Sequence, residues 1–415
     1  MANKWSEKDV RLAKDKSLSH AQVADFTGYP EHAVRAKRQR IGFVPNVERT
    51  TVSDDVLQQR SAYWQDQYKE LHRKYDTVLK AGSAASQLVK MAASLAPKSY
   101  SNAPAIRTCR KKTDKPQSAL LMLTDTHVGA YISPQQTLGF GGYNFEIFLH
   151  RLSFLESGIT SILADHVNTH VPELVVCLGG DMLHGALNHG VEAGQVNTVF
   201  QQYFGAGHAL AQFLRNVARL VPKVRIYTAV GNHTRWQNQA KMPTDNRYSN
   251  LDQMLYVYTQ ALTKELRNVT WNLDTQPFAL FDVQGFKFHL SHGDHLKGGD
   301  KALGIPNHAV GRMVSSTTQL FGKHDRPAPH YYLTGHLHRS IALPHARGSV
   351  IVNGGFPGLD GFGLAAGFTP ADPTQTLFFV HPVYGKTATF DIQLKYAPSE
   401  GPLPYEIPVM GEGLR

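Results

Sequence analysis

Apolar and polar positions follow two different rhythms along this chain, and the rhythm changes near residue 115. Beyond that point, short apolar runs alternate with longer amphipathic stretches, which is typical of a layered α/β fold. The runs that we expect to form strands span residues 119–123, 174–178, 224–229, 286–291, 331–334 and 350–352. Each of the first five ends in polar residues. Because the carboxyl ends of successive strands meet at one edge of a sheet in α/β proteins, these polar clusters are expected to converge there.

The pattern before residue 115 is helical. Residues 5–43 predict three short helices, with Ser6 and Ser19 as caps of the first two and a tight turn at 27–30 before a third helix over 31–40. Gly42 ends that helix. The residues expected to form the small core are Val23, Phe26, Val34 and Ile41. The basic side chains that the third helix is expected to expose are Arg35, Lys37, Arg38 and Arg40.

This module, residues 1–46, resembles the helix-turn-helix modules at the front of phage and bacterial DNA-associated proteins. The shared features extend over about forty residues: an opening Trp5, a second helix that starts at Ser19, and a final Ala-Val-Arg-x-x-Arg stretch. The resemblance implies that the four basic residues of the third helix bind nucleic acid. The alternative is a small helical bundle that binds only protein.

A longer helix is predicted over residues 54–80, within a helical segment that spans 53–96. Its apolar residues recur every seven positions, and two tyrosines fill the intermediate seam. They are Leu57, Trp64, Leu71 and Val78, with Tyr68 and Tyr75. Fewer than four heptads are present, so the stripe either pairs with its copy in a homodimer or folds back on the rest of the chain. Residues 97–117 are rich in Lys, Arg, Ser and Pro and are expected to form a flexible basic linker.

The formal net charge of +10 is unevenly distributed. Residues 1–115 hold 22 Lys and Arg against 12 Asp and Glu, which leaves 21 of each sign for residues 116–415. A basic surplus can be a solvated face that aids solubility. Here it coincides with the helical module, which favours a polyanionic partner, DNA in the first place.

Nothing in the sequence indicates a membrane or an oxidising compartment. The first residues lack the apolar run of a signal peptide, and no later segment has the roughly 18 uncharged apolar residues of a membrane helix. Cys109 and Cys177 suit reduced thiols in a cytoplasm, which would be the host cytoplasm for a phage protein.

Five polar clusters that follow the predicted strands carry the chemistry. They are Asp125-Thr126-His127, Gly180-Asp181-Met182-Leu183-His184-Gly185, Gly231-Asn232-His233, His292-Gly293-Asp294 and Gly335-His336-Leu337-His338. A single cluster of this kind is more often a turn or a helix cap than a ligand. Five in order have no comparable structural explanation. Carboxylate, imidazole and amide oxygen are ligands that suit a pair of divalent ions. We expect manganese, with iron or zinc as the alternatives.

These clusters resemble the five motifs of the calcineurin-like metallophosphoesterase superfamily, over residues 118–396. The resemblance implies two packed sheets flanked by helices, with residues 397–415 as a tail. It assigns Asp125, His127 and His338 to one metal. It assigns Asn232, His292 and His336 to the other and makes Asp181 the bridge between them. His233 would then face the substrate.

Two cations about 3.5–4 Å apart suit phosphodiester hydrolysis because they bind the anion and hold an attacking hydroxide for in-line displacement. His233 would help the leaving oxygen or stabilise the pentavalent phosphorus. The ligating histidines must be neutral, so activity should fall in acid.

Position 184 helps to choose among branches of the superfamily. His184, with no Arg after it, resembles the double-strand-break-repair nucleases, and this implies that His184 orients the substrate phosphate. Two features depart from that branch: Thr234 stands where an acidic residue is usual, and no capping domain is evident. About seventy residues follow His338, and at least two of their segments, 350–352 and 388–394, are expected to be strands that complete the sandwich. Arg235 and Arg339, each just past a metal motif, either grip phosphates or are solvated.

Three functions remain open at this point. The leading hypothesis is a metal-dependent DNA nuclease brought to its substrate by the N-terminal module. Its main rival acts on a small cyclic or dinucleotide and uses that module for assembly. The third is a DNA-binding scaffold whose catalytic domain has decayed, although all seven expected ligands are present.

Overall fold

The computed structural model describes residues 5–15, 18–42, 115–167, 169–185, 199–235, 250–273, 278–298, 305–359, 363–364 and 371–407. They belong to two compact units, a helical one near the N-terminus and a larger α/β one. The helical segment 53–96, most of the basic linker and Cys109 lie outside the described residues. The heptad stripe and the homodimer therefore stay predictions. No helix within the described ranges is long and apolar enough to span a bilayer.

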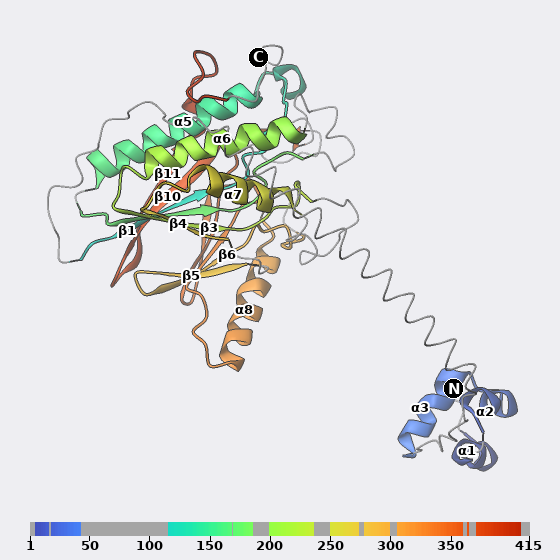
Figure 1. Cartoon of the computed structure of the whole chain (residues 1–415). Coiled ribbons are helices and arrows are strands. Elements are labelled where there is room, and N and C mark those ends of the chain that lie inside the picture. Colours follow the sequence, from blue (N-terminus) through green and yellow to red (C-terminus); the bar gives the residue numbers. More distant parts are fainter. Residues whose placement is uncertain are drawn as a thin grey trace, which may run out of the picture. The chain divides into compact units, whose positions relative to one another are not determined.

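The described residues of the N-terminal unit form three helices, as predicted. They are α1 (Glu7–Lys14), α2 (His20–Thr27) and α3 (Glu31–Arg40) (Figure 1). Ser6 and Ser19 each close a capping box, in which the side chain accepts from a backbone N–H of the first turn. Gly28 ends α2 with φ 71°, a left-handed conformation that glycine adopts without strain.

Two side chains of this unit lie where the pattern did not predict them. Phe26 is 65% exposed, because the buried stripe of the two-turn helix α2 runs through Val23 instead. Arg38 is buried and donates to the carbonyl oxygens of Ala13 (3.0 Å), Asp15 (2.8 Å) and Leu18 (2.8 Å). Those carbonyls end α1 and its following turn, where donors are lacking. The prediction that α3 exposes Arg38 is therefore wrong.

The α/β unit contains two sheets. In the described part of the chain the larger sheet has the order β11-β10-β1-β2-β3-β4 and the smaller one β5-β6-β7-β9-β8. The larger is built from β1 (Ser118–Leu123), β2 (Glu173–Leu178), β3 (Lys223–Thr228), β4 (Val269–Asn272), β10 (Thr374–His381) and β11 (Gly385–Gln393). The smaller is built from β5 (Ala279–Val283), β6 (Phe286–Leu290), β7 (Tyr331–Thr334), β8 (Ile341–His345) and β9 (Gly348–Val352).

Each sheet has a parallel centre. Strands β1 to β4 run parallel, and so do β6, β7 and β9, while β5, β8, β10 and β11 pair antiparallel at the margins. Leu123, Leu178 and Thr228 end β1, β2 and β3 in matching register. The residues that follow them are therefore delivered to one edge.

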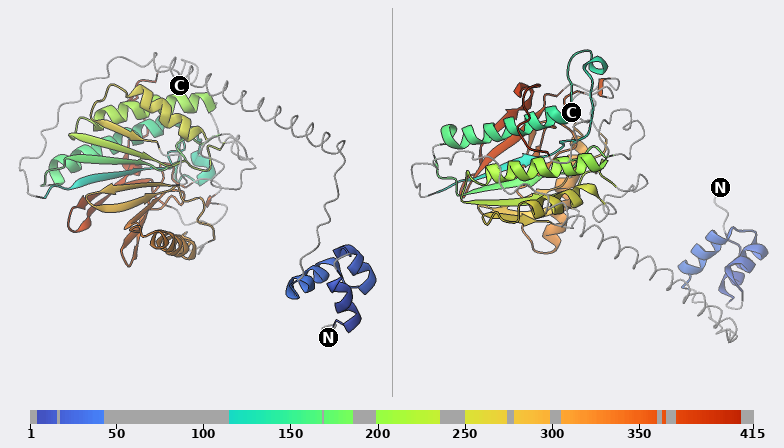
Figure 2. Two further views of the ribbon diagram at one scale, coloured as in Figure 1. Left: turned by 60° about the horizontal axis from the view of Figure 1, so that its bottom comes forward. Right: turned by 45° about the horizontal axis from the view of Figure 1, so that its top comes forward.

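Helices cover both outer faces of the paired sheets, as Figure 1 and Figure 2 show. Along β1, Leu120 and Met122 face the second sheet, whereas Leu121 and Leu123 face the helices. These helices are α5 (Phe145–Ser161), α6 (Val199–Val217) and α7 (Leu251–Leu262). Helix α8 (Asn307–Lys323) packs on the smaller sheet. The predicted α/β sandwich of two sheets flanked by helices is confirmed.

The first part of the predicted C-terminal tail packs on this unit. Tyr405 is buried, and its hydroxyl donates to Glu156 of α5 over 2.9 Å. The backbone of Glu406 exchanges two hydrogen bonds with the side chain of Gln212 on α6. Residues up to 407 thus belong to the folded unit.

Candidate metal centre

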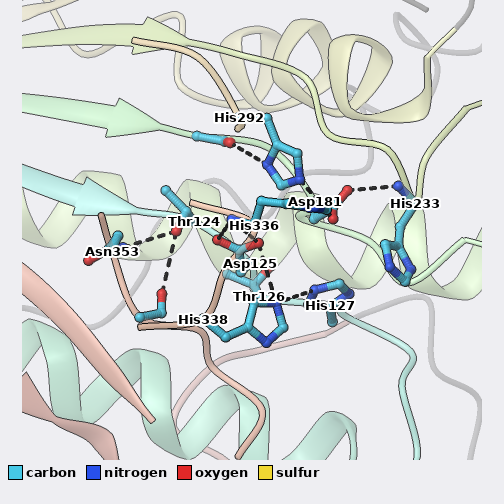
Figure 3. A network of polar contacts seen from close by, with 12 residues as sticks. Thr124, Asp125, Thr126, His127, Asp181, His233, His292, His336, His338 and Asn353 are labelled. Carbon is cyan, nitrogen blue, oxygen red and sulfur yellow. Dashed lines mark hydrogen bonds and ion pairs between the residues drawn. The ribbon is translucent and has the colours of Figure 1, made fainter. Parts of the chain in front are cut away.

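The five polar clusters come together where the edges of the two sheets meet (Figure 3). Three of them follow β1, β2 and β3 of the larger sheet, and two follow β6 and β7 of the smaller one. We expected convergence at the edge of one sheet. The site instead uses two, because each sheet carries its own parallel block whose strands end at the same side.

The first group of donors comprises Asp125, His127 and His338, whose ligand atoms lie within 4.8 Å of one another. The Nε2 atoms of His127 and His338 are 3.1 Å apart, and Nε2 of His338 lies 3.4 Å from Oδ1 of Asp125. Burial lowers the pKa of His127 well below its usual value. A neutral imidazole presents a lone pair, so this group fits a divalent cation.

The second group comprises Asp181, His292 and His336, again with ligand atoms within 4.8 Å. Nε2 of His292 lies 3.0 Å from Oδ2 of Asp181 and 3.1 Å from Oδ1 of Asn232. Its Nδ1 donates to the carbonyl of Gly179 over 2.9 Å, which leaves Nε2 as the acceptor in the neutral ring.

Three acceptor atoms that face one point require either a proton or a cation between them. In the protein alone the proton is favoured: burial would lower the pKa of His292, but the Asp181 carboxylate raises it to about 10. A divalent ion satisfies the same three acceptors, so the second group also fits a metal. Asn232, which is expected from the sequence to bind the same ion, lies next to His292 of this group.

Asp125 and Asp181 hold the backbone of other motifs as well as offering oxygens. Both oxygens of Asp125 accept from the N–H of His336, at 3.0 and 3.1 Å. Oδ1 of Asp181 accepts from the N–H of His233 over 2.8 Å. The clusters therefore position one another. The structure groups Asp181 with the second set of donors only, and its bridging role stays a prediction.

The backbone of the site is strained. Among the residues that the structure describes, eight other than glycine have positive φ, and five of them are expected ligands. These are Asp125 (54°), His127 (44°), Asp181 (50°), His336 (66°) and His338 (51°). Left-handed backbone costs such residues about 1 kcal/mol or more each, and it is concentrated at functional sites.

Two motif glycines allow the carboxylates to approach the backbone. A Cβ on Gly231 would lie 2.0 Å from Oδ1 of Asp181, and a Cβ on Gly335 would lie 2.2 Å from Oδ2 of Asp125. Any side chain at these positions displaces a donor. The glycines are thus needed for close approach.

The two histidines predicted to be catalytic lie beside the first group. Ligand atoms of His127, His184 and His233 are within 4.8 Å of one another, and the rings of His127 and His233 are 4.6 Å apart. Burial, followed by the charge of His233, lowers the pKa of His184 to about 4. His184 is therefore neutral at physiological pH. Its Nδ1 lies 3.4 Å from Nδ1 of His127.

The two arginines proposed for phosphate binding differ in their surroundings. Arg235 forms an ion pair with Asp294 of the fourth cluster, so its charge is already balanced. Arg339 is half-buried directly after His338. Phosphate binding by either arginine stays a prediction.

Several supporting residues were missed from the sequence. Asn353 donates to Thr124 beneath Asp125, over 3.0 Å. Thr234, the unusual residue after the third cluster, donates to Asn250, which in turn donates to the carbonyl of Gly231. Asp252, which is buried, was not singled out either, and an Asn-x-Asp at a helix start is too common to have indicated it.

No protein-family model matches this sequence, and no curated protein does. Solved structures with a similar fold include an archaeal phosphodiesterase, with TM-score 0.28, 11% identity, and coverage of 63% of this chain and 98% of that one. The phosphoesterase Yfce of E. coli gives 0.27, 16%, 66% and 100%, and Vps29 of Entamoeba histolytica gives 0.27, 13%, 66% and 98%. Because these scores are low, function has to be inferred from the site itself.

Proposed function

We propose that this protein is a two-metal phosphodiesterase of the calcineurin-like superfamily, and that its substrate is DNA. The observation that carries the proposal is the pair of adjacent donor groups, one around Asp125 and one around Asp181. Each group contains an imidazole nitrogen that can offer its lone pair to a cation. Two divalent ions held there would supply the positive charge that binds a phosphodiester and activates water.

The chain's own residues would hold the substrate and move a proton. His233 has its N–H fixed by Asp181 and its ring against His127, at the margin of the first group. From there it would donate a proton to the leaving oxygen. His184, neutral and next to both rings, would orient a phosphate oxygen through an N–H.

DNA as the substrate is supported by the N-terminal unit. With Arg38 buried, the side chains of α3 that remain for phosphates are Arg35, Lys37 and Arg40. Lys37 also lies over the ring of Trp5, which stacks on Tyr29. Arg35 and Arg40 are exposed and Lys37 is half-buried, so the last helix offers three cations for backbone contacts to a duplex. On this proposal the protein acts in the cytoplasm.

A second candidate substrate is a small cyclic or dinucleotide. It is favoured by the charge balance of residues 116–415, which contain 21 basic and 21 acidic residues. A neutral surface around two cations holds one phosphate without a basic track for a polymer.

One panel of assays separates these functions. The full chain is loaded with Mn²⁺, Fe²⁺ or Zn²⁺, and the metal ions bound per chain are counted. Its substrates are a bis-aryl phosphodiester, labelled single-stranded, duplex and nicked DNA, and cyclic nucleotides. Two ions per chain with cleavage of DNA supports the nuclease, and cleavage of small nucleotides alone supports the second candidate. Binding of DNA without hydrolysis under any metal would make the protein a scaffold.

A further inference from the structure

Asp252 is a fully buried carboxylate that touches no expected metal position but holds the backbone of two metal loops. It is the second residue of α7. Its Oδ2 accepts from the N–H of Asp181 and of Gly231, both over 2.9 Å, and its Oδ1 accepts from the N–H of Met182 over 3.1 Å. One side chain thus binds three backbone amides.

These amides belong to loops that follow different strands. Asp181 and Met182 follow β2, and Gly231 follows β3. The loops pack so closely that a Cβ on Gly180 would lie 2.5 Å from the nitrogen of Gly231. Amide N–H groups from two loops that point to one place repel each other unless an acceptor lies between them, and a buried amide without a partner destabilises the fold. Asp252 is that acceptor.

The same helix makes further contacts of this kind. The side chain of Asn250 donates to the carbonyl of Gly231 over 3.0 Å and accepts from Thr234 over 2.8 Å. The hydroxyl of Tyr256 donates to the carbonyl of Ala229 over 2.8 Å. The start of α7 therefore fixes the loop after β3 at several points, although Thr234 itself has no carboxylate to offer.

The held loops carry donors of the second metal group. Asp181 must turn its carboxylate toward His292 while its backbone stays at φ 50°, and Asn232 must direct its oxygen to the same ring. We propose that Asp252 is a positioning residue, which sets the distance between Asp181 and Asn232 and so builds the second metal position before any ion binds. The hydrogen bonds of Asp252 to the two loops are a property of the fold, and only their effect on turnover rests on the proposed function.

The test compares two substitutions of Asp252 with a matched one on the same helix. Asp252→Ala removes all three acceptor contacts. Asp252→Asn keeps one acceptor oxygen, which can serve Asp181 and Gly231 but turns an N–H toward Met182. Tyr258→Phe, the control, removes a buried hydrogen bond to His208 on α6, away from the loops. Affinity for Mn²⁺ is measured by titration calorimetry on the full chain, with the melting temperature recorded for each variant.

We expect Asp252→Ala to weaken binding of Mn²⁺ by about 10–100-fold, as removal of a ligand's hydrogen-bond partner does. Asp252→Asn should fall between it and the native chain, and Tyr258→Phe should stay within about 3-fold even if its melting temperature drops. Native affinity in Asp252→Asn overturns the proposal, whether or not the alanine variant folds. Equal losses in Asp252→Asn and Tyr258→Phe would show a purely structural role.

The kinetic readout separates this proposal from the proposed function. With Mn²⁺ at saturation, a misplaced loop should lower kcat for a bis-aryl phosphodiester while KM changes little. If the native chain hydrolyses nothing but Asp252→Asn still loses Mn²⁺ affinity, the phosphodiesterase proposal fails and the positioning role of Asp252 stands.

Discussion

Gly231 shows how a single hydrogen atom can decide whether the site exists. We predict that Gly231→Ala abolishes activity and empties the second metal position, because the added Cβ would lie 2.0 Å from Oδ1 of Asp181 and 2.2 Å from its backbone nitrogen. Metal content and hydrolysis of a bis-aryl phosphodiester check this. Gly311→Ala is the control, since its Cβ meets nothing within 4 Å and a helical alanine stabilises by about 0.5–1 kcal/mol. An active, fully loaded Gly231→Ala would mean that Asp181 is not a ligand.

His233 provides a second prediction at this scale. We expect His233→Ala to keep both ions and to lose about 10²–10⁴-fold in rate, because the ring stands beside the first donor group and a positioned acid contributes that much. Metal analysis of the purified variant is the companion measurement. Loss of an ion together with the rate would turn His233 into a ligand and contradict the division of roles.

That the expected metal ligands lie close together was predictable from the sequence, because each of their clusters follows an apolar run that forms a strand. Their partners were not. Arg38 reads as one more cation of a basic helix, and only the fold shows that it meets the carbonyls at the end of α1. Asp252 reads as an ordinary helix cap, and its contacts to Asp181 and Gly231 join residues 71 and 21 positions away. Neither contact leaves a local pattern.

At the scale of elements, strands that precede a motif were predictable and those at the margins were less so. Strand β10 is buried along its whole length, yet it begins Thr-Gln-Thr and reads as a surface segment. Its Gln375 is buried because it accepts from the N–H of Thr124, next to the site. Strand β8 contains Pro344, which is tolerated because β8 is an edge strand.

The interface between α6 and α7 contains a histidine that should make stability depend on pH. His208 is buried with Nε2 3.1 Å from the hydroxyl of Tyr258, and burial lowers its pKa to about 4. Below about pH 6.5, His208 is protonated in the unfolded chain but stays neutral in the folded chain until the pH nears 4. Protonation therefore favours unfolding. The free energy of unfolding should therefore fall between pH 6.5 and 4, by on the order of 2 kcal/mol from this residue.

Urea denaturation of the native chain and of His208→Gln, from pH 7.5 down to 4.5, measures this contribution. The variant should lose some stability at pH 7.5 and show a shallower decline below pH 6.5. His324→Gln, at the exposed end of α8, is the control and should follow the native curve. Identical slopes for native chain and His208→Gln would exclude His208 as the source.

For the whole molecule, the division of charge predicts a division of labour. Removing residues 1–115 should raise KM for long DNA and flatten its salt dependence, while hydrolysis of a small phosphodiester stays nearly unchanged, because the remaining residues carry 21 charges of each sign. On duplex DNA the log–log salt slope should become shallower by about 0.9 for each phosphate that no Lys or Arg neutralises any more.

A milder form of this experiment uses Arg35, Lys37 and Arg40, each changed to Ala. Arg38→Ala should instead lower the melting temperature of the N-terminal unit before it changes the salt slope, because Arg38 is buried and donates to backbone carbonyls. A truncated enzyme that degrades long DNA as well as the full chain at every salt concentration would favour the small-nucleotide substrate.

The left-handed backbone of the five expected ligands has an evolutionary consequence. Glycine adopts that conformation without strain, so glycine in place of the histidines at positions 127, 336 and 338 should make the metal-free protein more resistant to heat, whereas Asp125 and Asp181 also accept backbone N–H groups of other motifs. A library of random variants sorted only for thermal tolerance would accumulate such replacements and become inert. Sorted for turnover, the same library would retain the strained histidines, so these three positions are where selection for durability and selection for chemistry oppose each other.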